Sequence, residues 1–182
     1  SRRGPLLAVI MLPMAISPAA VGLLLLLFFT KTPLGSIVNE QLVIVNDVKG
    51  IIVAQFFLEL PLGISYFTAI FATIPRSYDE VALVMGFSHV EYLYRILVPM
   101  TRRQLFIGLL LVFTRALGDF GASYVVGGGI RGKTVTLPIY LFIVNQIGEV
   151  GVLTIALAMY VVSILIILTL IYQVESSGRE LM

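Results

Sequence analysis

Long apolar runs dominate the hydrophobic pattern of this chain. Four of them cover Leu6 to Phe29, Ile51 to Ile74, Leu105 to Val126 and Val152 to Tyr172. A bilayer core about 30 Å thick needs roughly 20 predominantly apolar residues per helix, whereas transmembrane barrels show alternating segments of about ten residues. The pattern therefore predicts an all-α, polytopic helical membrane protein with four transmembrane helices.

Composition supports this class and excludes others. The chain is 59% hydrophobic and only 12% charged, far from the usual fractions of soluble domains. It has no cysteine and a single histidine, His89. Disulfides and thiolate chemistry are therefore excluded, and no metal site is expected. The net charge of +2 gives no support to nucleic-acid binding.

The basic residues predict the orientation, because Lys and Arg near span ends are retained in the cytoplasm. A cytoplasmic N-terminus places residues 75–104 and the C-terminal tail inside, and residues 30–50 and 127–151 outside. The cytoplasmic set is then Arg2, Arg3, Arg76, Arg95, Arg102, Arg103 and Arg179, against Lys31, Lys49, Arg131 and Lys133 outside. Residues 1–182 are expected to form a single transmembrane domain. Because the chain opens directly on a span boundary, we expect preceding spans to be missing.

Two further features interrupt the simple four-span pattern. Pro13 and Pro18 lie inside the first run, and each removes a backbone donor, which predicts a broken helix. After the glycine-rich segment 127–134, residues Leu137 to Ile147 are apolar but too short to span. A re-entrant or interfacial helix is expected there.

The loop from Pro75 to Arg103 carries two predicted short helices. Ser77 with Glu80 and Ser88 with Glu91 have the spacing of capping boxes. Gly86 stands where a left-handed residue ends the first helix, and Pro99 is expected to stop the second. The apolar stripes are Tyr78, Val81, Ala82 and Met85 on the first helix, and Val90, Leu93, Tyr94 and Leu97 on the second.

These two stripes require covering surfaces. The first is expected to offer an apolar knob to a partner, and the second to pack on the chain's own spans. Capping and chain reversal alone would also account for Glu80 and Gly86, so their direct contact with a partner stays open.

The loop resembles the EAA loop of ABC importer permeases of the binding-protein-dependent type. The resemblance lies in Glu80-Val81-Ala82, Gly86 and Ile96 to Pro99, with Val81 and Val98 departing from the usual alanine and leucine. It implies that the first short helix is the coupling helix that docks on an ATPase subunit. The implied coupling residues are Glu80, Val81, Ala82, Met85, Gly86, Ile96 and Pro99.

Other segments are similar to molybdate, tungstate and sulfate permeases. They are Leu12 to Gly22, Gln55 with Leu60-Pro61, Arg115 to Ala122 and Gly132 to Pro138. The resemblance implies a non-catalytic subunit of a prokaryotic inner-membrane importer, with molybdate or tungstate as first choice and sulfate next. The implied partners are ATP-binding cassette subunits that bind ATP and Mg, an extracytoplasmic binding protein and a second permease copy. No cofactor is expected in the chain itself.

Iron or thiamine permeases, a passive channel and an assembly factor remain as alternatives to an oxyanion importer. An intramembrane protease would need a serine and histidine pair or a His-Glu-x-x-His helix, and neither is present.

Charged residues inside the third run have two readings. An unpaired charge in a membrane helix is costly, and Arg115 and Asp119 have the spacing of a pair on one helix face. Alternatively, this segment lines the translocation path as a gate formed by Arg115, Gly118, Asp119, Phe120 and Gly121. Glu59 either pairs with Arg115 or faces a wet cavity. Arg131 and Lys133 either attract an anion or serve solubility.

Overall fold

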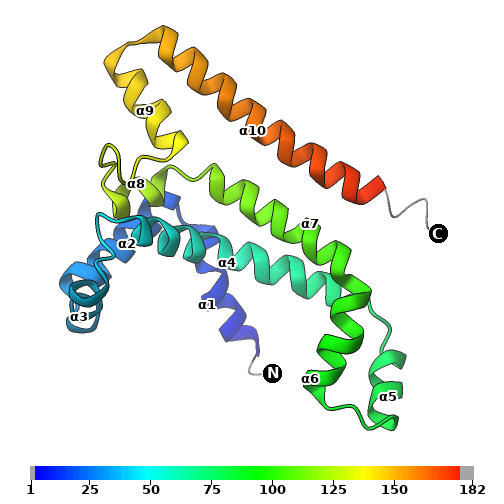
Figure 1. The fold of residues 1–182 in the computed structure, drawn as a ribbon. Coiled ribbons are helices and arrows are strands. Elements are labelled where there is room, and N and C mark those ends of the chain that lie inside the picture. The colour runs from blue at the N-terminus through cyan, green and yellow to red at the C-terminus, as the bar shows by residue number, and fades with distance from the viewer. Residues whose placement is uncertain (1–2, 177–182) are drawn as a thin grey trace. The chain divides into compact units, whose positions relative to one another are not determined.

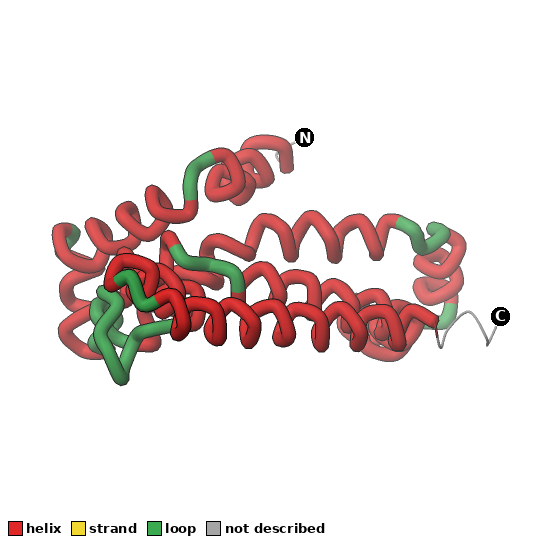
Figure 2. Tube along the Cα trace, turned by 90° about the horizontal axis from the view of Figure 1, so that it is seen from above, coloured by secondary structure: helices red, strands yellow, loops and turns green. Residues whose placement is uncertain are grey.

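A computed structural model describes residues 3–176, so Arg2 and Arg179 lie outside the described part. Every regular element in that part is helical, as Figures 1 and 2 show. The elements are α1 (Arg3–Ala15), α2 (Pro18–Lys31), α3 (Pro33–Leu42), α4 (Val48–Ala72), α5 (Ser77–Val84), α6 (His89–Tyr92), a π-helical segment (Leu93–Leu97), α7 (Val98–Leu117), α8 (Gly121–Gly127), α9 (Leu137–Ile147) and α10 (Val150–Ser176).

Three helical segments among the described residues are long and apolar enough to cross a membrane. They are Val48–Ala72, His89–Leu117 and Val150–Gln173. The bent pair of α2 and α3, which meet at 88°, would make a fourth if it counted as one span. The predicted all-α polytopic class is confirmed, and α9 has the bounds expected for the short external helix.

The first apolar run is broken as expected. Helix α1 ends at Ala15, and Ser17 caps α2 by accepting a hydrogen bond from the Ala20 backbone N–H at 3.3 Å. Pro18 occupies the first turn of α2, where its missing N–H has no cost.

The third run is also broken, so the continuous span predicted over residues 105–126 is wrong. Helix α7 ends at Leu117, and the Gly118 and Asp119 amides close a tighter turn onto Arg115 and Ala116. Asp119, one residue before the cap position Phe120, then accepts hydrogen bonds from the Ala122 and Ser123 N–H groups in the first turn of α8. An apolar window does not reveal such a break, because one aspartate and two glycines hardly lower its mean hydropathy.

Helix α3 was not predicted. Thr32 caps it by accepting from the Gly35 N–H at 3.0 Å, and Pro33 follows in the first turn. The Thr-Pro dipeptide was the available signal, since this pair is typical of a helix start.

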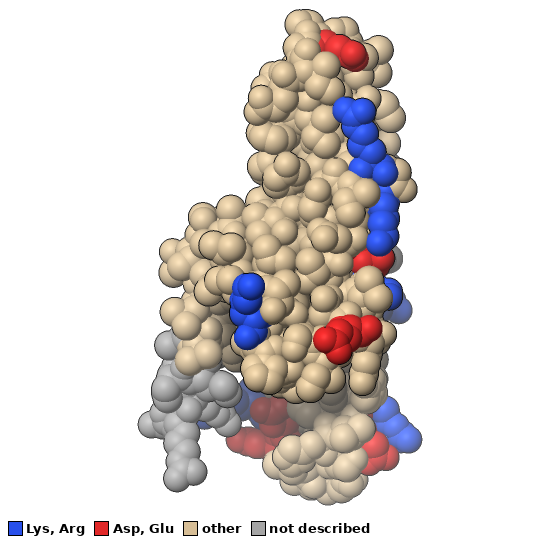
Figure 3. Space-filling view, turned by 90° about the vertical axis from the view of Figure 1, so that its left-hand side faces the viewer, with Lys and Arg blue, Asp and Glu red and all other residues tan. Residues whose placement is uncertain are grey.

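Contacts divide the chain into two compact units. Unit 1 comprises the chain up to Pro61 and Thr114–Leu165, and unit 2 comprises Leu62–Phe113 and the chain from Ile166 onward. The core of unit 1 is formed by Val21, Ala54, Leu58, Ala122 and Val126. In unit 2, Gly108 of α7 packs against the rings of Tyr66 and Phe67 on α4. Most of the face drawn in Figure 3 is uncharged, with lysine, arginine and acidic side chains gathered in small groups.

Candidate functional site

Helix α5 ends in the backbone geometry expected for Gly86. The Phe87 N–H donates to the Ala82 carbonyl at 3.0 Å, and the Gly86 N–H donates to the Leu83 carbonyl at 3.1 Å. These two bonds form a Schellman motif, which needs a left-handed residue, and Gly86 has φ of +76°. The predicted left-handed helix end is confirmed.

Only one of the two predicted capping boxes forms. Ser88 Oγ accepts from the Glu91 N–H at 3.3 Å, and the Glu91 carboxylate accepts from the Ser88 N–H at 3.1 Å. The box at Ser77 and Glu80 was wrong, because α5 begins at Ser77 with Arg76 in the cap position and without a side-chain cap. Glu80 is exposed, so capping no longer accounts for it.

Pro99 does not stop the second helix of the loop. It lies in the first turn of α7, and the π-helical segment Leu93–Leu97 joins α6 to α7. There the Val98 N–H donates to the Leu93 carbonyl five residues back. Proline cannot donate to the carbonyl four residues before it, and a local π-helical turn relieves this mismatch. Ile96 lies in this segment and is partly buried.

The apolar stripe predicted on α5 is split between two faces. Val81, Val84 and Met85 are 57%, 88% and 67% exposed, whereas Ala82 is 2% exposed. Ala82 therefore lies on the inner face, beside a cavity of about 490 Å³ that α5 and α6 share with Phe87 and Leu97. We call the exposed group Val81, Val84 and Met85 the α5 knob.

Unit 1 holds a second cavity of about 520 Å³ among helix ends. Its lining comes from the start of α2, the middle of α4, the end of α7 and the turn into α8: Ser17, Pro18, Ala19, Leu58, Glu59, Thr114, Arg115, Gly118, Asp119, Phe120 and Gly121. We call it the Arg115 cavity. It contains all five residues predicted for the gate, and it adds Ser17 to Ala19, which the sequence prediction did not include.

The charges in the Arg115 cavity pair differently from the expected α7 pair. Arg115 Nε donates a hydrogen bond to Glu59 Oε1 at 3.1 Å and lies 3.0 Å from Oε2. Asp119 instead accepts from the Ala122 and Ser123 N–H groups and from the Ser123 hydroxyl. The Arg115–Asp119 pair was wrong because α7 ends before Asp119, so the two residues no longer share a helix face.

The three remaining gate residues are packed closely. A Cβ at Gly118 would lie 3.1 Å from the Tyr160 hydroxyl on α10. A Cβ at Gly121 would lie 2.9 Å from the Ala19 nitrogen. The Phe120 ring packs on Phe142 of α9 at a centroid distance of 4.8 Å. Glycine at positions 118 and 121 therefore permits neighbouring helices to approach closely.

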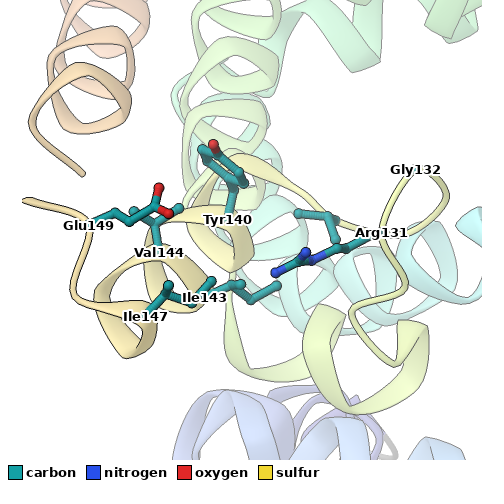
Figure 4. Close-up of a pocket in the computed structure, with 8 residues that line it drawn as sticks. Arg131, Gly132, Tyr140, Ile143, Val144, Ile147 and Glu149 are labelled. Atoms are coloured by element: carbon teal, nitrogen blue, oxygen red, sulfur yellow. The ribbon is translucent and has the colours of Figure 1, made fainter. Parts of the chain in front are cut away.

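A third cavity, of about 400 Å³, lies beside α9 in unit 1. Figure 4 shows Arg131 extending from the glycine-rich loop towards Ile143, with Glu149 at the other end and Tyr140 between them. Arg131 is exposed, and no acceptor for its guanidinium lies in the described part of the chain. We call this the Arg131 pocket.

Lys133, in contrast, is engaged in a structural contact. Its Nζ lies 2.9 Å from Asp47 Oδ2 and donates to the Asn46 carbonyl at 3.0 Å. The hydrogen bond from Lys133 lowers the pKa of Asp47 below its ordinary value, with help from the Lys49 N–H. These contacts tie the segment before α4 to the glycine-rich loop.

Within residues 3–176, no group of three or more histidine or acidic residues is placed to hold a metal. The sequence prediction missed Val84, the most exposed apolar side chain of α5, because the predicted stripe consisted of Tyr78, Val81, Ala82 and Met85. It also missed Ser17 and Ala19, although Ser17-Pro18 is a typical start of a helix.

Comparisons with known proteins show the family of the chain. A family model described as "Binding-protein-dependent transport system inner membrane component" matches residues 1–177. The sulfate transport system permease protein CysW of Escherichia coli is 33% identical over 143 residues, which cover 78% of this chain and 49% of that protein.

Two further relatives have different names. The probable transport system permease protein NifC of Clostridium pasteurianum is 31% identical over 74% of this chain and 48% of its own length. The molybdenum transport system permease protein ModB of Mycobacterium bovis is 27% identical over 87% of this chain and 61% of its own length. The chain spans about half the length of the first two. It belongs to the family of binding-protein-dependent transport system inner membrane components.

Proposed function

We propose that the chain is part of the membrane-spanning subunit of an ABC importer that moves a tetrahedral oxyanion into a prokaryotic cell. The observation that carries this proposal is the α5 knob, an exposed apolar surface held on a short helix by the Schellman motif at Gly86. An exposed apolar surface of this kind is typical of a contact site for a protein partner or a membrane. The coupling helix of the resembled importers has this role.

The proposed partner at the α5 knob is an ATP-binding cassette subunit. Closure of two such ATPases would draw two docked α5 helices together and re-pack the spans of a homodimer, a rigid-body switch. The permease itself supplies no catalytic group. ATP and Mg belong to the partner subunits.

The Arg131 pocket is the proposed contact for the extracytoplasmic binding protein. An exposed guanidinium at the edge of a pocket suits a carboxylate or an anion presented by a partner. Lys133 does not share this role, because Asp47 and Asn46 already engage it.

The oxyanion is proposed from the names of relatives together with the Arg115 cavity. Those names specify sulfate for CysW and molybdenum for ModB. Arg115 supplies a half-exposed cation in this cavity, and ionisable residues within membrane segments mark ion pathways. Molybdate or tungstate is the first choice and sulfate the next.

The test is ATPase stimulation in a reconstituted complex. Full-length permease, its ATPase and its binding protein are placed in proteoliposomes, and hydrolysis and uptake are followed with molybdate, tungstate, sulfate, ferric iron or thiamine. We expect one or more oxyanions, delivered by the binding protein, to stimulate both activities. Stimulation by iron or thiamine alone would overturn the substrate class. Uptake without any ATPase would favour a channel.

A further inference from the structure

The Arg115 cavity brings together a half-exposed cation and a buried anion. The side chain of Arg115 is 47% exposed and that of Glu59 is 4% exposed. Both carboxylate oxygens lie near the same nitrogen, Nε, and Oε2 has no hydrogen-bond donor of its own in the described structure. Glu59 therefore engages only one edge of the guanidinium.

The terminal nitrogens of Arg115 remain available to a ligand. A guanidinium is a planar group with donors on its terminal nitrogens, and it binds tetrahedral oxyanions in a bidentate manner. Within residues 3–176, no acceptor is found for the Arg115 terminal nitrogens. The cavity thus contains a cation whose oxyanion-binding edge is unused.

A second donor lies in the lining of the same cavity. Ala19 is in the first turn of the fourteen-residue helix α2, where a backbone N–H has no acceptor within its own helix. The positive end of a helix favours an anion. Gly121 lies against this turn without placing a side chain over the N–H, since a Cβ there would lie 2.9 Å from the Ala19 nitrogen.

The cavity nevertheless carries a formal net charge of −1. Glu59 and Asp119 contribute two carboxylates against one guanidinium. The Asp119 charge is held by the first turn of α8, whereas Glu59 directly opposes Arg115. A site made for tight retention of a dianion would leave its cation unopposed. A transport path instead needs binding weak enough for release.

Resting on the proposed function, we infer that Arg115 and the Ala19 N–H form a transient oxyanion subsite, and that Glu59 sets its affinity by competing for Arg115. An arriving oxyanion takes the terminal nitrogens of Arg115 while Glu59 repels it. The repulsion keeps the bound state short-lived, so the anion passes through.

The experiment measures binding of radiolabelled sulfate and of molybdate to the permease–ATPase complex in nanodiscs, without the binding protein. Glu59→Gln removes the competing charge at nearly constant shape, and we expect it to tighten binding by about tenfold or more. The matched control is Glu40→Gln on α3, an exposed carboxylate outside the cavity, which should leave the affinity unchanged. Glu59→Asp withdraws the carboxylate by one methylene and should give an oxyanion affinity between those of the wild type and Glu59→Gln. This variant replaces Glu59→Gln in the test if the glutamine variant does not fold.

Two results would overturn the inference. In the first, both Glu59 variants bind the oxyanion with the same affinity as the wild type. In the second, a Glu59 variant binds the oxyanion more tightly even when Arg115→Gln is also present. Uptake assays distinguish failure of the subsite inference from failure of the proposed function. If the wild-type complex transports an oxyanion and the Glu59 variants bind it no more tightly, only the inference fails. If the wild type transports no oxyanion, the proposed function fails.

Discussion

Asp119 is held by more hydrogen bonds than any other carboxylate in the Arg115 cavity. Its two oxygens accept from Ala122 N–H at 3.2 Å, Ser123 N–H at 2.9 Å and Ser123 Oγ at 2.6 Å, and the residue is 6% exposed. A buried carboxylate with this set of donors satisfies the N–H groups in the first turn of a helix. Its structural role is therefore sufficient to explain an acidic residue at this position.

Replacing Asp119 with alanine should destabilise the protein by about 2 kcal/mol, because the buried donors of Ala122 and Ser123 in the first turn of α8 lose their acceptor. The measurement is unfolding of the detergent-solubilised complex in a denaturant series, with Glu40→Ala as the exposed control. Asp119→Ala should remain destabilising when Arg115→Gln is also present, because the hydrogen bonds of Asp119 to the Ala122 and Ser123 N–H groups do not involve Arg115. Loss of the Asp119→Ala effect in the Arg115→Gln background would instead indicate that the two side chains form a direct pair.

Asp47 gives a pH-dependent contribution of predictable sign. Its pKa in the folded protein lies below the ordinary value of 3.8, chiefly through the hydrogen bond from Lys133. The stabilisation is therefore complete well above pH 3.8 and is lost as the pH falls through the lower, folded pKa. Unfolding midpoints of wild type and Asp47→Asn, compared from about pH 6 down to about pH 3, should converge at the acid end. A constant difference across this range would contradict the assignment.

At the scale of elements, close packing of α2 on α8 depends on Gly22. A Cβ there would lie 2.8 Å from the Ala122 Cα and 3.0 Å from its carbonyl oxygen, and neither backbone atom can move freely. Gly22→Ala should cost about 1 to 3 kcal/mol of stability. Gly63→Ala is the control, since its nearest neighbour would be at 3.8 Å, and improved helix propensity should make it neutral or stabilising. Equal effects in the same denaturant series would argue against this packing.

The end of α5 allows steric and conformational effects to be separated. No atom lies within 4 Å of a Cβ at Gly86, so only its φ of +76° restricts substitution. Gly86→Val should disturb the Schellman turn, displace the α5 knob and reduce uptake per ATP hydrolysed. Gly86→Asn should retain most of the coupling, because asparagine tolerates the left-handed region. Equal transport-to-hydrolysis ratios for the two variants would contradict a conformational role.

Sequence prediction succeeded where a local signal decides the structure. The extent of the apolar run predicted the bounds of α9, and the structure confirms them. The spacing of Ser88 and Glu91 predicted a capping box, and Gly86 predicted a left-handed residue, and both are observed. It failed where tertiary partners decide. Arg115 pairs with Glu59 rather than Asp119 because α4 lies beside the end of α7. A local sequence pattern carries no information about this contact between helices.

At the scale of the whole molecule, most apolar surface on the longest helix has no protein cover. Only 11% of the most hydropathic window of α10 is buried, and Ile155, Met159, Ile166 and Tyr172 are among its exposed large side chains. These side chains require lipid or further protein to cover them. Stability is therefore expected to depend on the membrane-like environment, and measurements need one lipid or detergent throughout.

The predicted orientation can be tested because the chain contains no cysteine. Val84→Cys places a thiol on the α5 knob, at a side chain that is 88% exposed, and Arg131→Cys places one at the Arg131 pocket. The distribution of Lys and Arg predicts that a membrane-impermeant maleimide labels the Val84→Cys variant only in inside-out vesicles and the Arg131→Cys variant only in right-side-out vesicles. Docking of the ATPase should protect the thiol on the α5 knob and leave the thiol at the Arg131 pocket reactive. Reversed labelling would overturn the orientation, whereas undiminished labelling of the knob thiol in the complex would overturn docking at α5 while leaving the orientation intact.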